Sequence, residues 1–176
     1  IPSNYVDSGG RRVTYYSGSL DIAAHELTHG VISYTSGLLY QNESGALNEA
    51  FADIMGTSAE FFYHPPSSTP FTGTQTRKAD YVMGEDTYRA HPYYSWARNG
   101  IRSMENPGRY GDPDHYSIRY TGSGDSGGVH INSGIPNQAF YLAIEGGTNR
   151  TSGITVQGVG GANRAQIEKV FYRAFL

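Results

Sequence analysis

The sequence contains no cysteine among its 176 residues. This absence excludes a disulfide framework, a thiolate metal site and a cysteine nucleophile, and it leaves the redox compartment open. No apolar run approaches the ~18 residues that a membrane-spanning helix needs. There is also no basic-then-apolar leader, and the first residue is Ile1 rather than Met. We therefore expect a soluble globular piece of a longer protein, with no membrane partner.

Charged residues are scarce as well, at 16% of the chain, against about 25% in an average globular protein. The 13 Lys and Arg and the 16 Asp and Glu give a net charge of −3. This mild acidity, without a block of basic residues, argues against nucleic acid or an anionic membrane surface as the main partner. Glycine is abundant, at 23 residues, which predicts many loops and tight turns.

Helical periodicity dominates the rest of the chain and predicts a mainly α fold with a small β or irregular N-terminal part. Residues 13–16 favour a strand after the Ser8-Gly9-Gly10 turn. Ser19 can cap the first helix, whose helically spaced apolar residues are Ala23, Leu27, Val31 and Tyr34. Stop and start signals bound four helices: from Leu20 to before Gly37, from after Gly45 to before Pro65, from about Ile135 to before Gly146, and from about 164 to 176.

Residues 64–128 differ from these segments because they hold few periodic apolar stretches and many Gly, Pro, Ser and Asp. Irregular stretches of this length are uncommon and are usually functional or held by something other than a core, for which bound ions are one option. The last helical pattern ends without a Gly, Asn or Pro stop signal. We interpret this as truncation at the C-terminus.

The motif His25-Glu26-Leu27-Thr28-His29 lies inside the first helical pattern. At about 100° per residue, four residues return to within about 40° of the start, so both imidazoles project from one face. That pair is a two-point chelate for zinc, and Glu26 lies close enough to reach a water on the metal without being a ligand. On the motif alone, two surface histidines beside an unrelated glutamate remain an alternative.

A catalytic zinc needs a third protein ligand, and Glu49, 20 residues after His29, is the candidate. Asp53 follows it by four residues on the same helix face and can accept a hydrogen bond from a ligand histidine. A solvated acidic stripe is the alternative. However, apolar residues surround both acids, and a buried carboxylate needs a partner such as a metal. These neighbours are Leu47, Ala50, Phe51 and Ile54.

Several longer blocks carry a family resemblance: HELTHGV, YQNESGALNEAFADIMG, SMENPGRYGDPDHYS and YTGSGDSGGVHINSGIPNQAFYLA. From about Leu20 to its end, the chain resembles the thermolysin-like zinc metalloendopeptidases. The resemblance implies that residues 19–176 are the helical zinc-binding lobe of that fold, truncated at its C-terminus. It implies that residues 1–18 are a remnant of an N-terminal β-rich lobe.

The same resemblance implies the activity and the roles of the site residues. The reaction is hydrolysis of peptide bonds by a zinc-activated water, with bulky apolar residues preferred on the amine side of the cleaved bond. One zinc ion is held by His25, His29 and Glu49, while Glu26 acts as the base. The supporting residues are His130 and Tyr40 for the oxyanion, Asp125 to orient His130, Asp53 to orient a zinc ligand, and Arg102 to bind a substrate carbonyl.

Four further acids match positions that supply calcium ligands in that family: Asp21, Glu60, Asp80 and Glu85. Hard oxygen ligands drawn from an irregular segment suit Ca²⁺. Where members with two calcium ions have a further glutamate, this chain has Val82. We therefore expect one structural calcium ion, with ordinary surface acids as the alternative.

The resemblance implies peptide or protein substrates and a secreted protein. Without the rest of the N-terminal lobe and the final helices of the C-terminal lobe, the last helix would expose Ile167, Val170 and Phe171. This predicts either pairing with the N-terminal lobe or self-association over exposed apolar faces. The alternative to an enzyme is a zinc- and calcium-binding fragment without catalysis. The intact Glu26 and His130 favour the enzyme, because a structural metal site requires neither.

Overall fold

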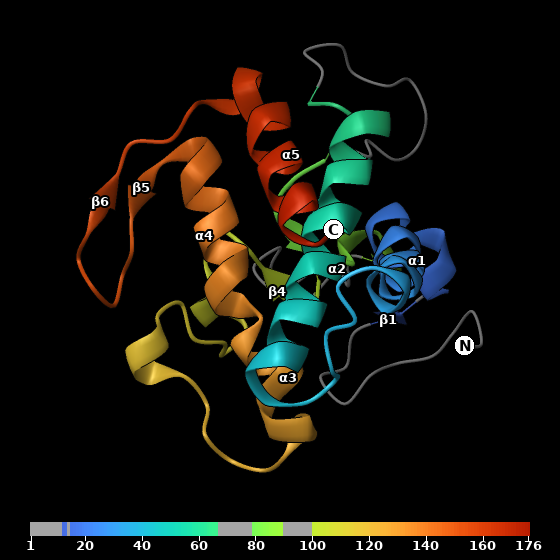
Figure 1. Cartoon of the computed structure of the whole chain (residues 1–176). Helices are drawn as coiled ribbons and strands as arrows, with labels where there is room; N and C mark the ends of the chain where they lie inside the picture. Colours follow the sequence, from blue (N-terminus) through green and yellow to red (C-terminus); the bar gives the residue numbers. More distant parts are fainter. Residues whose placement is uncertain (1–11, 14, 67–78, 90–99) are drawn as a thin grey trace.

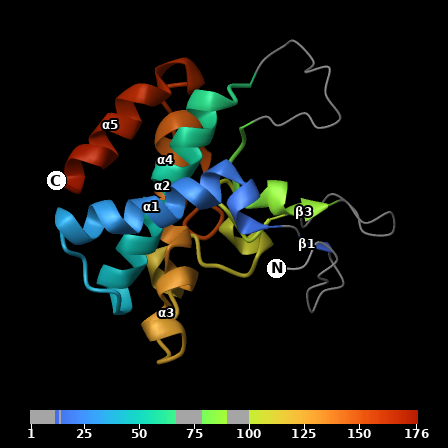
Figure 2. The same cartoon turned by 90° about the vertical axis from the view of Figure 1, so that its right-hand side faces the viewer.

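The computed structural model describes residues 12–13, 15–66, 79–89 and 100–176, and helices form most of it (Figure 1). The long helix α2 (Asn42–Tyr63) lies at the centre. Helix α1 (Leu20–Tyr34) packs across it, and Figure 2 shows this crossing along the length of α1. The others contact α2 along its sides: α3 (Asp125–Asn132), α4 (Gly134–Glu145) and α5 (Arg164–Ala174). The mainly α prediction is confirmed.

Among the described residues, short strands pair into three two-stranded antiparallel sheets. They pair β1 (Arg12–Val13) with β3 (Tyr88–Arg89), β2 (Val82–Met83) with β4 (Arg102–Ser103), and β5 (Gly147–Thr148) with β6 (Thr155–Val156). Short 3-10 turns cover 16–18, 85–87, 107–109, 116–118 and 161–163. The strand expected over 13–16 is therefore wrong at Tyr15, which lies outside β1, and at Tyr16, which begins a 3-10 turn, while residue 14 lies outside the described part.

The hydrophobic core fills the space between α1, α2, α4 and the β2–β4 sheet. Its buried members are Ile22, Ile54, Met83, Met104, Phe140 and Ile144. Ile167 and Phe171 of α5 pack against this cluster, so the expectation that both would be exposed is wrong. Full burial of an apolar side chain of this size contributes about 1.5–3 kcal/mol to the stability of the fold. The core thus fixes the relative positions of the two helices that carry the site.

The predicted helix boundaries are right at most ends. Helix α1 begins at Leu20, but the Ser19 hydroxyl donates to the Asp21 carboxylate and makes no cap hydrogen bond. Helix α2 begins earlier than predicted, at Asn42, whose φ is 52°. Helix α4 ends before Gly146, as predicted, because that residue has a φ of 75°. Helix α3 was not predicted.

The apolar stripe that predicted α1 faces solvent. The exposed fractions are 76% for Leu27, 46% for Val31 and 93% for Tyr34, while Ile22 and Ile32 are buried. In α5, Val170 is exposed as expected. No helix among the described residues is long and apolar enough to cross a bilayer.

The irregular region expected over 64–128 is irregular where the structure describes it, at 79–89 and 100–124, with only short strands and 3-10 turns. The rest of that prediction lies largely outside the described residues, at 67–78 and 90–99.

Candidate metal and catalytic site

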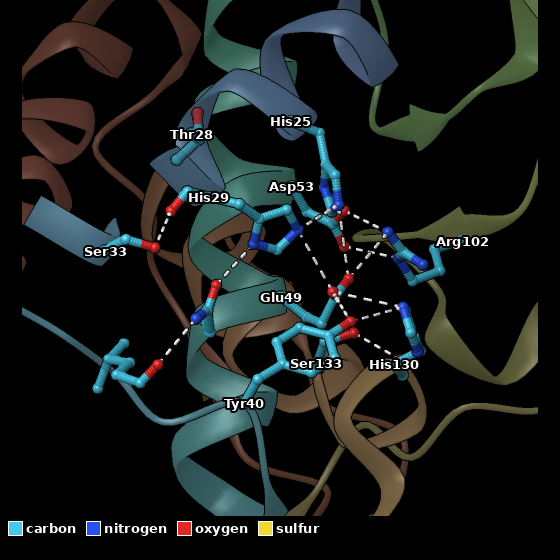
Figure 3. Close-up of polar contacts among 12 residues, drawn as sticks. His25, Thr28, His29, Ser33, Tyr40, Glu49, Asp53, Arg102, His130 and Ser133 are labelled. Carbon is cyan, nitrogen blue, oxygen red and sulfur yellow. Dashed lines mark hydrogen bonds and ion pairs between the residues drawn. The ribbon is translucent and has the colours of Figure 1, made fainter. Parts of the chain in front are cut away.

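His25 and His29 lie one turn apart on α1 and face the same way (Figure 3). Their Nε2 atoms are 3.0 Å apart, and the two rings are nearly perpendicular, at 87°. This juxtaposition follows from the helical period, because residues four apart share a face. Two imidazole nitrogens are therefore available to one small cation.

Glu49 brings a third donor from α2. Its Oε2 lies 3.5 Å from His25 Nε2, and its Oε1 lies 3.4 Å from His29 Nε2. One ligand atom from each of the three residues can be chosen so that all lie within 4.8 Å of one another. Glu49 is 1% exposed, and its Oε2 has no hydrogen-bond partner among the described residues. Two imidazoles and a carboxylate are a donor set for zinc, so these residues fit that ion.

The outer nitrogens of both histidines face oxygen atoms. His25 Nδ1 lies 2.8 Å from Asp53 Oδ1, and His29 Nδ1 lies 2.7 Å from Asn48 Oδ1. The Asn48 amide in turn donates to the Leu38 carbonyl at 2.9 Å. Such partners fix the tautomer and the orientation of a ligand histidine. Asn48 was missed from the sequence, and its position next to Glu49 is the only signal that could have identified it.

Asp53 is completely buried and is surrounded by donors. Arg102 donates to it twice, from Nε at 2.7 Å and from an NH2 group at 2.6 Å, and Asn137 donates at 2.8 Å. Burial alone would raise the pKa of Asp53, but Arg102 and His25 hold the pKa well below its ordinary value. Asp53 is therefore a carboxylate that joins α2 to β4 and α4 behind the histidines. Asn137 was not predicted.

His130 and Tyr40 approach the same centre from the other side. The Tyr40 hydroxyl lies 3.0 Å from His130 Nε2 and donates to Glu49. His130 Nε2 lies 3.3 Å from Glu49 Oε1, and His130 Nδ1 lies 2.6 Å from Asp125 Oδ1. Burial, followed by the Glu49 carboxylate, raises the pKa of Tyr40, so the phenol stays protonated and can donate.

Two adjoining cavities open at this centre. The first, of about 340 Å³, is lined by His25, Glu26, His29, Ser33, Leu38, Tyr40, Asn48, Glu49 and His130. The second, of about 420 Å³, shares His25, Glu26 and His130 and adds Arg102 with a largely apolar wall of Tyr16, Ile22, Ala23 and Ile101. Glu26 is exposed and borders both cavities. A polar centre therefore lies beside an apolar pocket.

The acids expected to bind calcium separate into two sets. Glu60 and Glu85 lie together with Asp86, which was not predicted, and the ligand atoms of these three are within 4.8 Å of one another. Asp21 instead accepts from the backbone of Ile22 at 2.7 Å and of Gly84. Asp80 accepts from the backbone of Val82 at 2.6 Å. The carboxylates of Asp21 and Asp80 thus accept hydrogen bonds from backbone N–H groups.

Glu60 is the most buried of the three acids Glu60, Glu85 and Asp86, which we call the acidic group. It is 1% exposed, and its Oε2 has no hydrogen-bond partner among the described residues. Burial and then the charge of Asp21 raise its pKa, and burial and then the charge of Glu60 raise that of Glu85. Two neighbouring acids with raised pKa values, Glu60 and Glu85, fit a divalent cation, whose charge would compensate theirs.

These features define a class: a helical lobe built around two histidines and one glutamate whose donor atoms could hold a metal ion. A family model described as the thermolysin metallopeptidase alpha-helical domain matches residues 36–176, and one for the thermolysin metallopeptidase catalytic domain matches residues 3–33. The chain belongs to the thermolysin metallopeptidase family, and the resemblance seen in the sequence is confirmed.

Individual relatives agree with this assignment. A thermostable neutral protease of Geobacillus stearothermophilus and a thermolysin of Alicyclobacillus acidocaldarius are each 46% identical over 172 residues, covering 98% of this chain and 28% of theirs. A solved structure, the precursor of protealysin, a metalloproteinase from Serratia proteamaculans, matches with a TM-score of 0.59 and 28% identity. That match covers 78% of this chain and 45% of the other. The chain thus spans about 28% of the length of the curated relatives that it matches.

Proposed function

We propose that this chain carries the catalytic centre of a zinc-dependent endopeptidase, with one zinc ion held by His25, His29 and Glu49. The observation that supports this most strongly is the position of Glu26 and His130 on the cavity that holds the three donor atoms. A structural metal site would need neither residue. Bound there, zinc would lower the pKa of a coordinated water toward ~7 and polarise the carbonyl of the scissile bond.

The side chains around this centre divide the remaining chemistry. Glu26 borders the cavity of the donor atoms and would take the proton of the attacking water and pass it to the leaving amine. The Tyr40 hydroxyl and His130 Nε2 lie 3.0 Å apart. Both groups can donate a hydrogen bond to the oxygen that gains negative charge. Asp125 holds the His130 ring through Nδ1. Arg102 borders the apolar cavity, where it would bind a substrate carbonyl.

The apolar cavity suggests the substrate preference. We propose that it receives a bulky apolar side chain on the amine side of the cleaved bond, because Ile22, Ala23 and Ile101 line it next to Glu26. Transfer of such a side chain from water into an apolar wall supplies about 25 cal/mol per Å² buried.

A peptide series that varies only this residue tests the preference. We expect kcat/KM to fall by at least ~10-fold for each methylene removed between Leu and Ala. Ala23→Leu should fill the cavity and reverse the order in favour of small residues. Leu27→Ala is the matched control, because Leu27 lies on the same helix with 76% exposure and outside the cavity. Equal rates for Leu and Ala peptides would contradict the proposal.

The zinc content of the folded, desalted chain tests the metal site directly. We expect a ratio near one zinc per chain, lost in His29→Ala and kept in His115→Ala, whose ring is bonded locally to Ser117. A ratio near zero in the folded chain would overturn the zinc site. A ratio near one without peptide hydrolysis would instead favour the non-catalytic metal-binding fragment.

We further propose one structural calcium ion at Glu60, Glu85 and Asp86, where it would hold residues 79–87 against α2. The two-lobe division, with residues 1–18 separate from 19–176, and secretion remain inferences from the family. Detection of the protein in the culture medium, and not in the cell pellet, would test secretion.

A further inference from the structure

The segment that carries His130 begins with a left-handed turn. Asp125, Ser126, Gly127 and Gly128 have φ values of 53°, 51°, 87° and 82°. Only after them does α3 continue as a right-handed helix toward His130. Left-handed backbone is unfavourable for Ser and uncommon for Asp, so contacts from outside the turn help to hold it.

Asn132 supplies such contacts by closing the segment into a loop. Its Oδ1 accepts the N–H of Tyr120 at 2.8 Å, and its Nδ2 donates to the carbonyl of Tyr120 at 3.0 Å. Asn132 is only 6% exposed, so these bonds are largely shielded from water. One side chain therefore ties both backbone groups of Tyr120 to the end of α3, with the left-handed turn between them.

The turn packs closely against its neighbours within this loop. A Cβ atom on Gly128 would lie 2.6 Å from the Tyr120 ring and 3.0 Å from Asn132 Nδ2. On its other side, a Cβ atom on Gly127 would lie 2.1 Å from Asn42 Oδ1 at the start of α2. The turn is thus wedged between the Tyr120–Asn132 pair and α2.

The position of the turn decides the position of the imidazole. Asp125, its first residue, accepts the backbone N–H of His130 at 2.8 Å from Oδ2 and lies 2.6 Å from His130 Nδ1 through Oδ1. A displaced Asp125 would therefore displace the ring. His130 Nε2 would then lose its approach to the Tyr40 hydroxyl and to Glu49.

We propose that Asn132 is a positioning residue for the reaction: by fixing Tyr120 it holds the left-handed turn, and through Asp125 it holds His130 in its donating orientation. This inference rests on the proposed function for the role of His130. Asn132 itself lies outside both cavities of the site. Its effect on the reaction would therefore pass through His130.

The kinetic test compares Asn132→Ala with the parent chain. We expect kcat to fall about 10- to 100-fold, because small misplacements of a catalytic group cost up to about 10². KM should stay within about two-fold, since the donor acts mainly in the transition state. Asn132→Asp keeps the shape and one of the two bonds, and it takes the place of the alanine variant if that chain does not fold.

A second variant pair separates positioning from a general loss of structure. In a His130→Ala background, Asn132→Ala should cause no further loss of kcat, because the group that it positions is gone. Asn149→Ala is the matched control: Asn149 is also buried and also bonds backbone, to Asp114 and Ser152, but it lies away from the site. We expect its kcat to be unchanged. Equal losses from Asn132→Ala with and without His130 would overturn the proposal.

Amide hydrogen exchange tests the same idea without activity. In Asn132→Ala, the amides of Gly128 and His130 should exchange about ten-fold faster, because the bonds that hold them depend on the turn. Asn149→Ala should leave them unchanged. Unchanged exchange in Asn132→Ala would overturn the proposal. If the parent chain hydrolyses no peptide, the proposed function fails, and the exchange rates still decide whether Asn132 holds the turn.

Discussion

Glu26→Gln is expected to lower kcat by about 10²–10⁴ while zinc stays bound, because the substitution removes a general base and nothing else. The Glu26 side chain is exposed and borders both cavities. It belongs neither to the three-residue donor group nor to the core. Glutamine has the same size but cannot take a proton from the attacking water.

The measurement is kcat for a peptide substrate, together with zinc content and melting temperature for the same preparations. Glu43→Gln is the matched control, because Glu43 is an exposed glutamate on α2 that Tyr116 and Arg119 contact outside both cavities of the site. The control should keep full activity. Unchanged turnover in Glu26→Gln with zinc bound would show that the proposed mechanism is wrong.

The parts of this site that could be predicted are those that a helix places by its own period. His25 and His29 are four residues apart, as are Glu49 and Asp53, and the structure brings the donor atoms of the first three within 4.8 Å. Asp53 reaches His25 from the next turn of α2. These contacts need only two helices that cross, and the core between α1 and α2 supplies the crossing.

The partners contributed by amide side chains could not be predicted. Asn48, Asn137 and Asn132 each bond a group far away in the sequence, and no periodicity identifies such pairs. Helix α3 was missed for a related reason. Its first residues are Asp, Ser and two glycines in left-handed backbone, a composition typical of a loop.

The apolar residues of α1 show the limit of periodicity itself. Leu27, Val31 and Tyr34 predicted a helix correctly, yet they are exposed, and the core is reached by Ile22 and Ile32. The period identifies the type of element. Which face is buried depends on the neighbouring helices, and a single sequence does not place them.

Calcium is expected to stabilise the fold more at about pH 8 than at about pH 5, because Glu60 and Glu85 of the acidic group hold protons that a cation would displace. The pKa values of Glu60 and Glu85 are raised above the ordinary value of 4.5. As pH rises above that value, the unfolded chain loses these protons first and the folded chain retains them. Without a cation, these two groups therefore make folding less favourable as pH rises.

A bound cation reverses this dependence. Its charge replaces the retained protons, so its affinity grows as they leave, and the gain in stability follows the ratio of free calcium to Kd. At about 100 times Kd the gain is about 2.7 kcal/mol. The measurement is the free energy of unfolding at both pH values, with and without calcium, and calorimetric titration should give one ion per chain, in keeping with Val82 at the position of a further acid.

Two variants locate the effect. Glu60→Gln should stabilise the calcium-free chain at about pH 8 and abolish the response to calcium, because it removes both the repulsion and a ligand. Asp112→Asn is the matched control: burial raises the pKa of Asp112 to about 6, and it lies outside the acidic group. That variant should also stabilise the chain at about pH 8 but keep the full calcium response. If calcium stabilised the parent chain and Glu60→Gln equally, the ion would bind elsewhere, and the acidic group would only make folding less favourable.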